Sequence, residues 1–150
     1  MSILVFGGSG FIGSRFIKCW SKNNSEEIVN IDKLSYASDP SNLDFITNNG
    51  NYTFYHEDIN NKDTIRDIIS KHKPKIFINF AAETHVDNSI LSSYEFIRTN
   101  VLGVQVLLDI FREYYLNSSE NTDFKFIQVS TDEVYGDLSI NESPFTEESK

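Results

Sequence analysis

Three glycines at intervals of three residues follow the first apolar run of the chain. Residues 2–6 have the composition of a fully buried strand, and Gly7-Gly8-Ser9-Gly10-Phe11-Ile12-Gly13 leads from it into a predicted helix of about ten residues. In such a unit the first glycine permits a tight turn, the second lets the backbone approach a pyrophosphate, and the third lets the helix pack on the strand. Unpaired amides at the helix start can then bind an anion. The segment predicts a dinucleotide-binding unit.

A second predicted strand, 28–31, ends in Asp32, nineteen residues after Gly13. An acid at this place can accept hydrogen bonds from both hydroxyls of an adenosine ribose, and its charge repels a 2′-phosphate. The expected cofactor is therefore NAD rather than NADP. The next three residues, Lys33-Leu34-Ser35, would continue around the adenosine.

Three more strands are predicted, at 52–55, 75–80 and 124–129, and helices separate them. This alternation is typical of a parallel sheet joined by right-handed crossovers. We therefore predict an α/β fold, a Rossmann-type doubly wound parallel sheet with strand order 3-2-1-4-5. With 150 residues, 39% of them hydrophobic, the chain can bury one core, so residues 1–150 are expected to form one NAD-binding domain.

Two of the connecting helices are defined by their apolar spacing. The first begins near Asn60 or Asn61, which could cap it, and runs through Lys71. The second covers roughly 94–115. The residues expected to form the apolar stripes are Ile65, Ile68 and Ile69 on the first helix and Phe96, Ile97, Val101, Val104, Leu107, Leu108 and Phe111 on the second. Residues 136–150 are polar and turn-rich and are expected to be loop.

Charge and composition exclude several classes of partner. With 22 acidic and 13 basic residues the net charge is −9, which argues against nucleic acid or an anionic membrane, so phosphate must be bound locally by backbone amides. The apolar runs are too short for a membrane span, and the amino terminus enters a strand without a leader, so a cytoplasmic location is expected. The single cysteine, Cys19, is expected to be reduced and packed in the first helix. No metal site is expected.

Thr131, Asp132 and Glu133 place a hydroxyl and two carboxylates directly after the predicted strand at 124–129. The carboxyl ends of strands in an open parallel sheet line the ligand crevice. One hydrogen-bond donor and two proton carriers at that edge indicate a site for proton transfer. Taken alone, such a triplet is more often the solvated end of a strand. The dinucleotide-binding motif upstream is what favours the functional interpretation.

Four segments together resemble a known family. They are Gly7-Gly8-Ser9-Gly10-Phe11-Ile12-Gly13, Asn30-Ile31-Asp32-Lys33-Leu34-Ser35-Tyr36-Ala37, Ala81-Ala82-Glu83-Thr84-His85-Val86-Asp87 and Ser130-Thr131-Asp132-Glu133-Val134-Tyr135-Gly136. With them the chain resembles the nucleotide-sugar 4,6-dehydratases of the extended short-chain dehydrogenase class, in particular those that act on dTDP-glucose. The last segment is the most specific, because related epimerases and decarboxylases usually lack its Asp-Glu pair.

The resemblance implies a role for each motif. Phe11 and Ile12 would contact the pyrophosphate, residues 32–35 the adenosine ribose, and Asp58-Ile59 the adenine. Residues 80–84 and Thr99 would line the path to the nicotinamide. The implied NAD-binding set is Gly7, Gly10, Phe11, Ile12, Gly13, Asp32, Lys33, Leu34, Ser35, Asp58, Ile59, Phe80, Ala81, Ala82, Glu83, Thr84 and Thr99. The implied substrate contacts are Thr84 and Thr131, where family members commonly have Ser in place of Thr84.

The family's reaction gives the triplet its chemistry. It oxidises C4 of a glucose ring with bound NAD, eliminates water between C5 and C6, and returns the hydride to C6, which leaves a 4-keto-6-deoxy sugar. By resemblance, Glu133 would remove the C5 proton as general base, Asp132 would protonate the departing C6 hydroxyl, and Thr131 would hydrogen-bond the C4 oxygen. Crowding of the two carboxylates is expected to raise one pKa and to keep that acid neutral near pH 7.

One part of the family pattern is missing. The class uses a Tyr-x-x-x-Lys, in which the tyrosine deprotonates the C4 hydroxyl, and none of the seven tyrosines has a lysine four residues later. Tyr94 with Arg98 comes nearest, and we interpret that pair as part of the fold. The resemblance therefore implies the N-terminal half of a longer enzyme, truncated before its C-terminal substrate domain and inactive alone.

Two other functions stay open at this point. An epimerase or decarboxylase of the same class would share every motif except a use for Asp132 and Glu133. A non-catalytic NAD-binding module would need neither the acids nor the absent tyrosine and lysine. The implied partners are a nucleoside-diphosphate-glucose substrate and, in the full-length enzyme, a second copy in a homodimer, with dTDP and UDP as alternative nucleotides.

Overall fold

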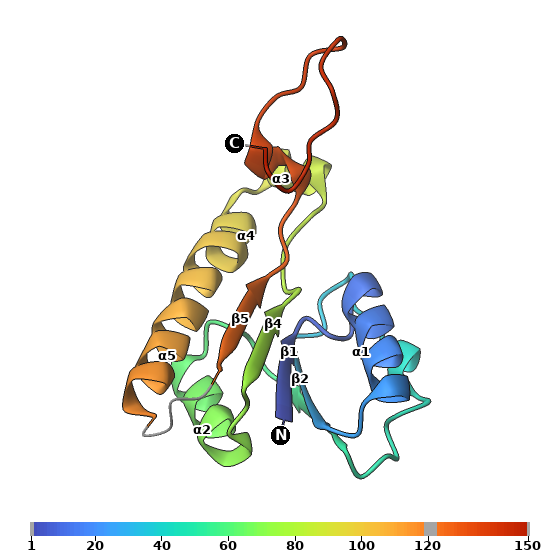
Figure 1. Ribbon diagram of the computed structural model, residues 1–150, viewed down its shortest axis with the longest axis vertical. Coiled ribbons are helices and arrows are strands. Elements are labelled where there is room, and N and C mark those ends of the chain that lie inside the picture. The colour runs from blue at the N-terminus through green and yellow to red at the C-terminus, as the bar shows by residue number, and fades with distance from the viewer. Residues whose placement is uncertain (1, 119–122, 150) are drawn as a thin grey trace.

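Five parallel strands form a single sheet in the computed structural model, which describes residues 2–118 and 123–149. The strands are β1 (Ser2–Phe6), β2 (Glu27–Asp32), β3 (Tyr52–His56), β4 (Ile76–Asn79) and β5 (Lys125–Gln128). Their order is β3-β2-β1-β4-β5, and every neighbouring pair is parallel (Figure 1). The predicted Rossmann-type sheet is confirmed. Because the order reverses between β1 and β4, the carboxyl ends of these two strands form the switch point where such sheets bind ligands.

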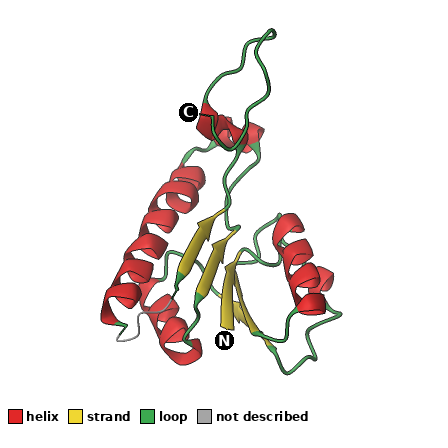
Figure 2. Ribbon diagram, viewed as in Figure 1, coloured by secondary structure: helices red, strands yellow, loops and turns green. Residues whose placement is uncertain are grey.

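Helices cover both faces of the sheet. Helix α1 (Phe11–Asn23) packs on one face, and α2 (Lys62–His72) and α5 (Val104–Asn117) pack on the other (Figure 2). Strand β1 is buried along its whole length because its neighbours and both helix layers enclose it. Ile3 and Val5 contact the cluster around α1, whereas Leu4 and Phe6 contact the cluster around α2 and α5. This double burial explains why the strand is apolar without alternation.

The long helix predicted at 94–115 contains a π-helical segment. It consists of α4 (Tyr94–Phe96), the π-helical η2 (Ile97–Gly103) and α5, and it ends at Asn117. The predicted apolar stripe is partly wrong: Leu107 is buried as expected, but Val101 is 59% exposed, and Ile97 and Leu108 are 53% and 43% exposed. A π-helical turn bonds each residue to the fifth one along rather than the fourth, so it shifts the face that later residues present.

Three short elements were not anticipated. They are the 3₁₀ turns η1 (Pro40–Leu43) and η3 (Asp132–Tyr135) and the helix α3 (Val86–Leu91). The loop expected after residue 135 is confirmed over its described part, 136–149, where turns are the most regular structure and the chain projects beyond the sheet (Figure 1). Among the described residues, none of the helices combines the length and apolar character that crossing a membrane requires.

The expectation that Cys19 is packed inside the first helix is wrong, because its side chain is exposed. Ile17, two positions earlier, is fully buried against the sheet. Residues two positions apart in a helix lie about 200° apart around its axis, so Cys19 lies on the opposite, outward side of α1.

Candidate functional site

The glycine turn after β1 leaves bare backbone at the switch point. Gly7 adopts φ +72°, and a Cβ on it would lie 2.6 Å from the backbone nitrogen of Ala81. A Cβ on Gly13 would collide with the Gly7 carbonyl oxygen, so the glycine lets α1 pack on the turn. Gly10 has open space around it apart from the Gly7 carbonyl at 3.4 Å. Gly7 and Gly13 thus occupy the mechanical roles predicted from their spacing, and Gly10 keeps the open space that the predicted approach to a pyrophosphate requires.

Gly8 is a fourth constrained position that the spacing argument did not single out. A Cβ there would collide with the side-chain oxygen of Asn30, which is fully buried in β2. The signal was present in the sequence, because a second glycine directly after Gly7 has no role in the three-glycine pattern.

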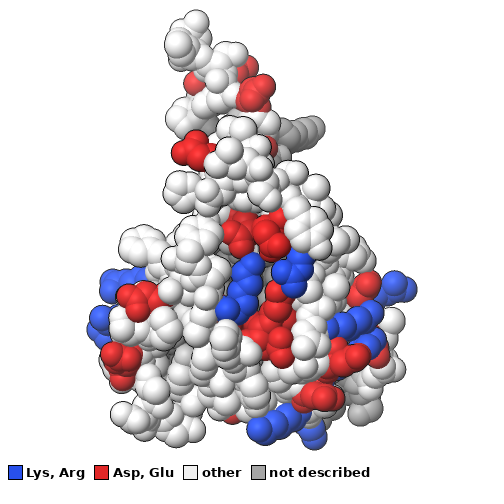
Figure 3. Space-filling model, turned by 180° about the vertical axis from the view of Figure 1, so that it is seen from behind, with Lys and Arg blue, Asp and Glu red and all other residues white. Residues whose placement is uncertain are grey.

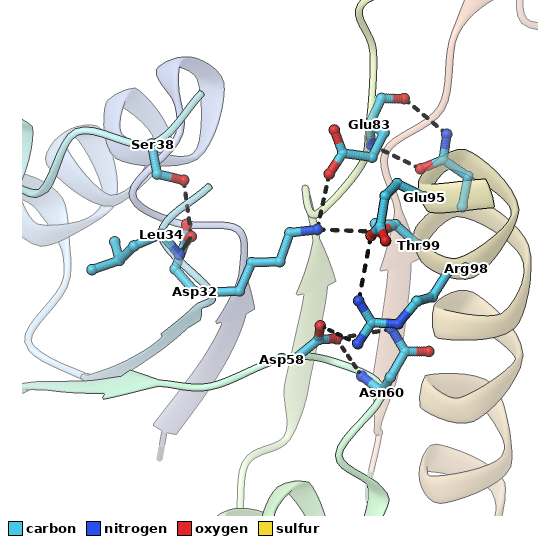
Figure 4. Close-up of polar contacts among 11 residues, drawn as sticks. Asp32, Leu34, Ser38, Asp58, Asn60, Glu83, Glu95, Arg98 and Thr99 are labelled. Carbon is cyan, nitrogen blue, oxygen red and sulfur yellow. Dashed lines mark hydrogen bonds and ion pairs between the residues drawn. The ribbon is translucent and has the colours of Figure 1, made fainter. Parts of the chain in front are cut away.

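Asp32 ends β2 with its carboxylate buried and hydrogen-bonded to its own loop. It is 5% exposed and accepts hydrogen bonds from the Ser9 amide at 2.9 Å, and from the Leu34 amide at 2.8 Å and the Ser38 hydroxyl at 2.9 Å (Figure 4). Leu34 has φ +54°, a strained value for a residue with a side chain, and the bond to Asp32 helps to hold it. A carboxylate offers about four acceptor positions, so about one is left for a ligand rather than the two predicted.

A narrow cavity of about 70 Å³ lies at the carboxyl ends of β1 to β4. We call it the first cavity, and its lining residues are Gly7, Gly10, Asp32, Lys33, Ser35, Ala37, Ser38, Asp58, Ile59, Phe80, Ala81, Ala82 and Thr99. All of these except Ala37 and Ser38 belong to the set predicted to bind the cofactor. The predicted residues that do not line it are Phe11, Ile12, Gly13, Leu34, Glu83 and Thr84. Ser38 carries no pattern in the sequence and is found only through its bond to Asp32.

A second cavity of about 370 Å³ lies between the loop after β4, the π-helical segment and the end of β5. It is lined by Ala82, Glu83, Thr84, Asn100, Val104, Gln128, Val129, Ser130 and Thr131. The two residues predicted to contact substrate, Thr84 and Thr131, therefore meet at one cavity although 47 positions separate them. Ala82 lines both cavities, so the two spaces adjoin.

Asn100 fixes the loop that separates the two cavities. Its side-chain oxygen accepts from the Glu83 amide at 2.9 Å, and its side-chain nitrogen donates to the Glu83 carbonyl at 2.8 Å (Figure 4). This pair of bonds ties the loop after β4 to the long helix. Sequence reasoning missed Asn100, because a single asparagine in an amphipathic helix gives no local signal of a contact 17 residues away.

Charged side chains bridge the elements around the first cavity. The Lys33 ammonium lies 2.8 Å from the Glu83 carboxylate and 3.4 Å from the Thr99 hydroxyl. The Arg98 guanidinium contacts Asp58 at 2.8 Å (Figure 4). In the middle of the face that Figure 3 shows, acidic and basic side chains lie next to one another. Because Lys33 lines the first cavity and Glu83 the second, a ligand that extends through both passes this ion pair.

One residue of the predicted catalytic triplet lines the second cavity, and the other two line neither cavity. Thr131 lines the second cavity, but Asp132 and Glu133 are exposed in the 3₁₀ turn η3 and are absent from its lining. Strand β5 ends at Gln128, three residues before the triplet, so the acids follow an extended connection rather than the strand itself. The prediction put the two acids at the strand end because the sequence shows where the apolar run ends but not how the chain continues after it.

The pKa of Glu133 is lowered, mainly by a hydrogen bond from the Thr131 hydroxyl, then by its own backbone amide and by the Asp132 carboxyl. This direction keeps Glu133 ionised, as a general base requires. The rise expected from crowding concerned the acid of the pair, whereas Glu133 is the predicted base, so the lowered pKa of Glu133 does not contradict that expectation.

Two further features complete the description of the charged groups and cavities. Arg98 contacts Asp58 and Glu95, so the Tyr94/Arg98 pair is part of the fold, as interpreted from the sequence. A cavity of about 470 Å³ that includes Lys73 and Lys75 lies at the opposite edge, where strands begin. Open parallel sheets bind their ligands at the carboxyl ends of strands, so we assign the site to the first and second cavities.

The residues at the switch point fit a dinucleotide. Bare glycine backbone opens at Gly10 toward the start of α1, where unpaired amides favour an anionic group. Asp32 supplies a carboxylate acceptor at the end of β2, and Asp58 with Ile59 supplies a polar and an apolar wall beyond it. Ala82 lines both cavities, so a ligand bound in the first would extend toward the second.

Known proteins of similar sequence belong to the same family that the four motifs resemble. A family model described as GDP-mannose 4,6 dehydratase matches residues 4–150. A dTDP-glucose 4,6-dehydratase of Haemophilus influenzae is 44% identical over 151 residues, which cover 99% of this chain and 45% of that protein. One from Escherichia coli is 44% identical over 140 residues, which cover 92% of this chain and 39% of that protein. The chain thus spans less than half the length of these relatives.

Solved structures with the same fold carry related ligands. A dTDP-glucose 4,6-dehydratase from Bacillus anthracis in complex with NAD superposes with a TM-score of 0.83 at 36% identity, covering 100% of this chain and 43% of that one. DesIV, the dTDP-glucose 4,6-dehydratase from Streptomyces venezuelae with NAD and TYD bound, gives 0.83 at 34% identity with 100% and 45% covered. A UDP-glucose 4-epimerase from Thermotoga maritima with UDP-glucose gives 0.76 at 31% identity with 93% and 41% covered.

Proposed function

This chain belongs to the GDP-mannose 4,6 dehydratase family, and from that membership we propose that residues 1–150 form the NAD-binding part of a nucleotide-sugar 4,6-dehydratase. The reaction proposed for the whole enzyme converts dTDP-glucose or UDP-glucose to its 4-keto-6-deoxy form and releases water. The dehydratases from B. anthracis and S. venezuelae with NAD bound support the choice of cofactor.

The observation that carries this proposal is the buried carboxylate of Asp32 beside the bare glycine turn. Asp32 stands at the carboxyl end of β2 and lines the same cavity as Gly7 and Gly10. A carboxylate there accepts a hydrogen bond from a ribose hydroxyl and repels a 2′-phosphate. The first cavity therefore favours NAD over NADP, with Asp58 and Ile59 next to the adenine and residues 80–82 toward the nicotinamide.

We assign the substrate to the second cavity, where Thr84 and Thr131 both present hydroxyl groups. NAD, when bound, supplies hydride acceptance from C4 of the sugar and its return to C6. Thr131 donates its one hydroxyl proton to Glu133 in the free chain, which helps to hold that carboxylate ionised, and would turn it to the C4 oxygen when the sugar binds. Glu133 would take the C5 proton, and Asp132 would give a proton to the departing C6 hydroxyl.

The Asp132-Glu133 pair separates this proposal from its alternatives. An epimerase has no elimination step and so no use for two proton carriers next to Thr131. The similarity to the T. maritima epimerase is accounted for by the shared fold and the shared cofactor-binding turn. A non-catalytic NAD-binding module would keep the first cavity without needing hydroxyls at the second.

Location and assembly are further parts of the proposal. NAD and nucleotide sugars are cytoplasmic metabolites, which supports a cytoplasmic location. A homodimer of the full-length enzyme is supported by the apolar side chains exposed on the long helix, among them Val101 at 59% and Leu108 at 43%.

A binding experiment on the purified chain tests the cofactor assignment. We expect NAD to bind more tightly than NADP by calorimetric titration, and Asp32→Asn to weaken NAD binding about tenfold, which corresponds to about 1.4 kcal/mol or one charge-assisted hydrogen bond. Asp39→Asn is the matched control, because Asp39 is an exposed aspartate bonded only to Ser41 among the contacts of its side chain that the structure gives. Equal affinity for NADP, or no binding of NAD, would contradict the proposal.

A further inference from the structure

Arg98 is a charged residue of the site that the proposed reaction does not use. It lies on the π-helical segment, and its guanidinium donates to the Asp58 carboxylate at 2.8 Å and to the Glu95 carboxylate at 3.4 Å (Figure 4). Its side chain is 34% exposed, whereas that of Asp58 is 22% exposed. Arg98 therefore reaches the first cavity only through Asp58, which lines it.

The carboxylate of Asp58 is nearly saturated with donors from the protein. One oxygen accepts from both the backbone and the side-chain nitrogen of Asn60, each at 2.8 Å. The other accepts from Arg98. Since a carboxylate has about four acceptor positions, about one remains, on the oxygen that Arg98 holds. Asn60 holds the first oxygen and Arg98 the second, so the direction in which that last position points depends on Arg98 as well as on Asn60.

The charge on Asp58 is also held by its surroundings. Burial by itself raises the pKa of Asp58, but the hydrogen bonds from Asn60 and the charges of Arg98 and Lys33 together outweigh it, so the net pKa is below its usual value. Asp58 is therefore ionised at neutral pH, and an ionised carboxylate accepts hydrogen bonds but donates none.

We propose that Arg98 is a positioning residue that sets the base specificity of the first cavity, by holding Asp58 so that its remaining acceptor position faces the base. This inference rests on the proposed function, in which the adenine of NAD lies beside Asp58. Adenine offers an exocyclic amine to that position. Hypoxanthine has a carbonyl oxygen at the same place, and two acceptors facing each other repel.

The expected difference in affinity follows from how polar binding sites reject analogues that lack a hydrogen-bond donor. A site built to receive an N–H group rejects an analogue that lacks it strongly, because its buried acceptor is then left unpaired. We expect the chain to bind NAD at least about tenfold more tightly than nicotinamide hypoxanthine dinucleotide. Removal of Arg98 frees Asp58 to turn away from the base, which reduces the contact with adenine more than it affects hypoxanthine.

The experiment measures the affinities of the chain for both dinucleotides by calorimetric titration. The variants are Arg98→Met, Arg98→Lys and, as matched control, Arg66→Met. Arg66 bridges α2 and α5 through Glu113 at 2.6 Å and contacts Asp63, three residues earlier, at 3.4 Å, while Arg98 contacts Glu95, also three residues earlier, at 3.4 Å. The two arginines thus share geometry and exposure, but neither Arg66 nor its partners line the first cavity.

The expected result is a fall of about fivefold or more in the NAD to hypoxanthine-analogue ratio for Arg98→Met, partial restoration in Arg98→Lys, and no change in Arg66→Met. A purely structural role for Arg98 would weaken both dinucleotides equally and leave the ratio unchanged, which would overturn the inference while the proposed function stands. Failure of the wild-type chain to bind either dinucleotide would overturn both. Arg98→Lys keeps the comparison valid if Arg98→Met does not fold.

Discussion

At the residue scale, the two acids of the first cavity are held by donors from their own loops and from neighbouring elements before any ligand arrives. Asp32 accepts three hydrogen bonds from residues 9 to 38, and Asp58 accepts three from Asn60 and Arg98. Such bonds fix the direction of the remaining acceptor position on each carboxylate. A ligand then meets oriented groups and loses less entropy on binding.

Asp58 also predicts how stability depends on pH. Its pKa is lower in the folded chain than the usual 3.8, so the folded state holds the proton less tightly than the unfolded state. The stability contributed by Asp58 is therefore fully present above pH 3.8 and is lost as the pH falls through the lower folded pKa. We expect the difference in unfolding free energy between wild type and Asp58→Asn to shrink below pH 3.8, measured by urea denaturation.

Asp39→Asn does not serve as the control here, since the pKa of Asp39 is also lowered, by Ser41. Asp44→Asn is suitable, because Asp44 is an exposed aspartate five residues after Asp39. A wild-type minus Asp58→Asn difference that stays constant from pH 6 down to pH 3 would contradict the linkage argument.

At the scale of elements, the unit of β1, glycine turn and α1 depends on close contact between backbones. Gly13 touches the Gly7 carbonyl, and Gly7 lies against the backbone of Ala81 after β4. The turn is therefore fixed from two sides, by its own helix and by the neighbouring strand. The loop after β4 is in turn fixed by the two hydrogen bonds from Asn100.

Gly13→Ala is expected to destabilise the chain by about 1 to 3 kcal/mol, because a Cβ collides with backbone atoms that cannot move independently. Thermal unfolding should show a lower midpoint by roughly 3 to 9 °C. Gly50→Ala is the matched control, since nothing lies within 4 Å of a Cβ there, and it should change stability by less than about 0.5 kcal/mol. Equal effects of the two substitutions would argue against close packing at Gly13.

At the scale of the whole molecule, the long helix exposes several apolar side chains. Tyr94, Ile97, Val101 and Leu108 are 68%, 53%, 59% and 43% exposed, and they recur at intervals of three, four and seven residues along the long helix. We call them the outer helix face. Strand β5 stands last in the sheet order and is therefore an edge strand, and Ile127 on it is 45% exposed. Apolar patches and open strand edges of this kind favour association.

The chain is therefore expected to self-associate with increasing concentration. The double substitution Val101→Lys with Leu108→Lys should shift it toward monomer in sedimentation velocity, because two charges would have to be buried in the interface. Phe45→Lys provides the control, since Phe45 is 50% exposed but lies outside the outer helix face. A wild-type chain that stays monomeric up to high concentration would contradict this expectation.

Local patterns in the sequence were sufficient for the fold. The strands at 2–6 and 28–32 and the glycine turn between them follow from apolar runs and turn residues that are close together in the chain. The order β3-β2-β1-β4-β5 follows from the alternation of strands and helices, because crossovers have one favoured hand. The helix stripe was predicted less well, since a π-helical turn changes the phase without any change in composition.

The amino-acid sequence by itself determined the sheet, the glycine turn and the position of Asp32 at the end of β2, because each depends on neighbours within a few residues or on one strand and the next. Only the tertiary structure decided that Arg98 meets Asp58, that Asn100 holds Glu83, and that Asp132 and Glu133 lie on a turn beyond β5. These contacts join residues 17 to 40 positions apart or depend on the path of an irregular segment. Such features depend on how packed elements place their surfaces, and no local period encodes them.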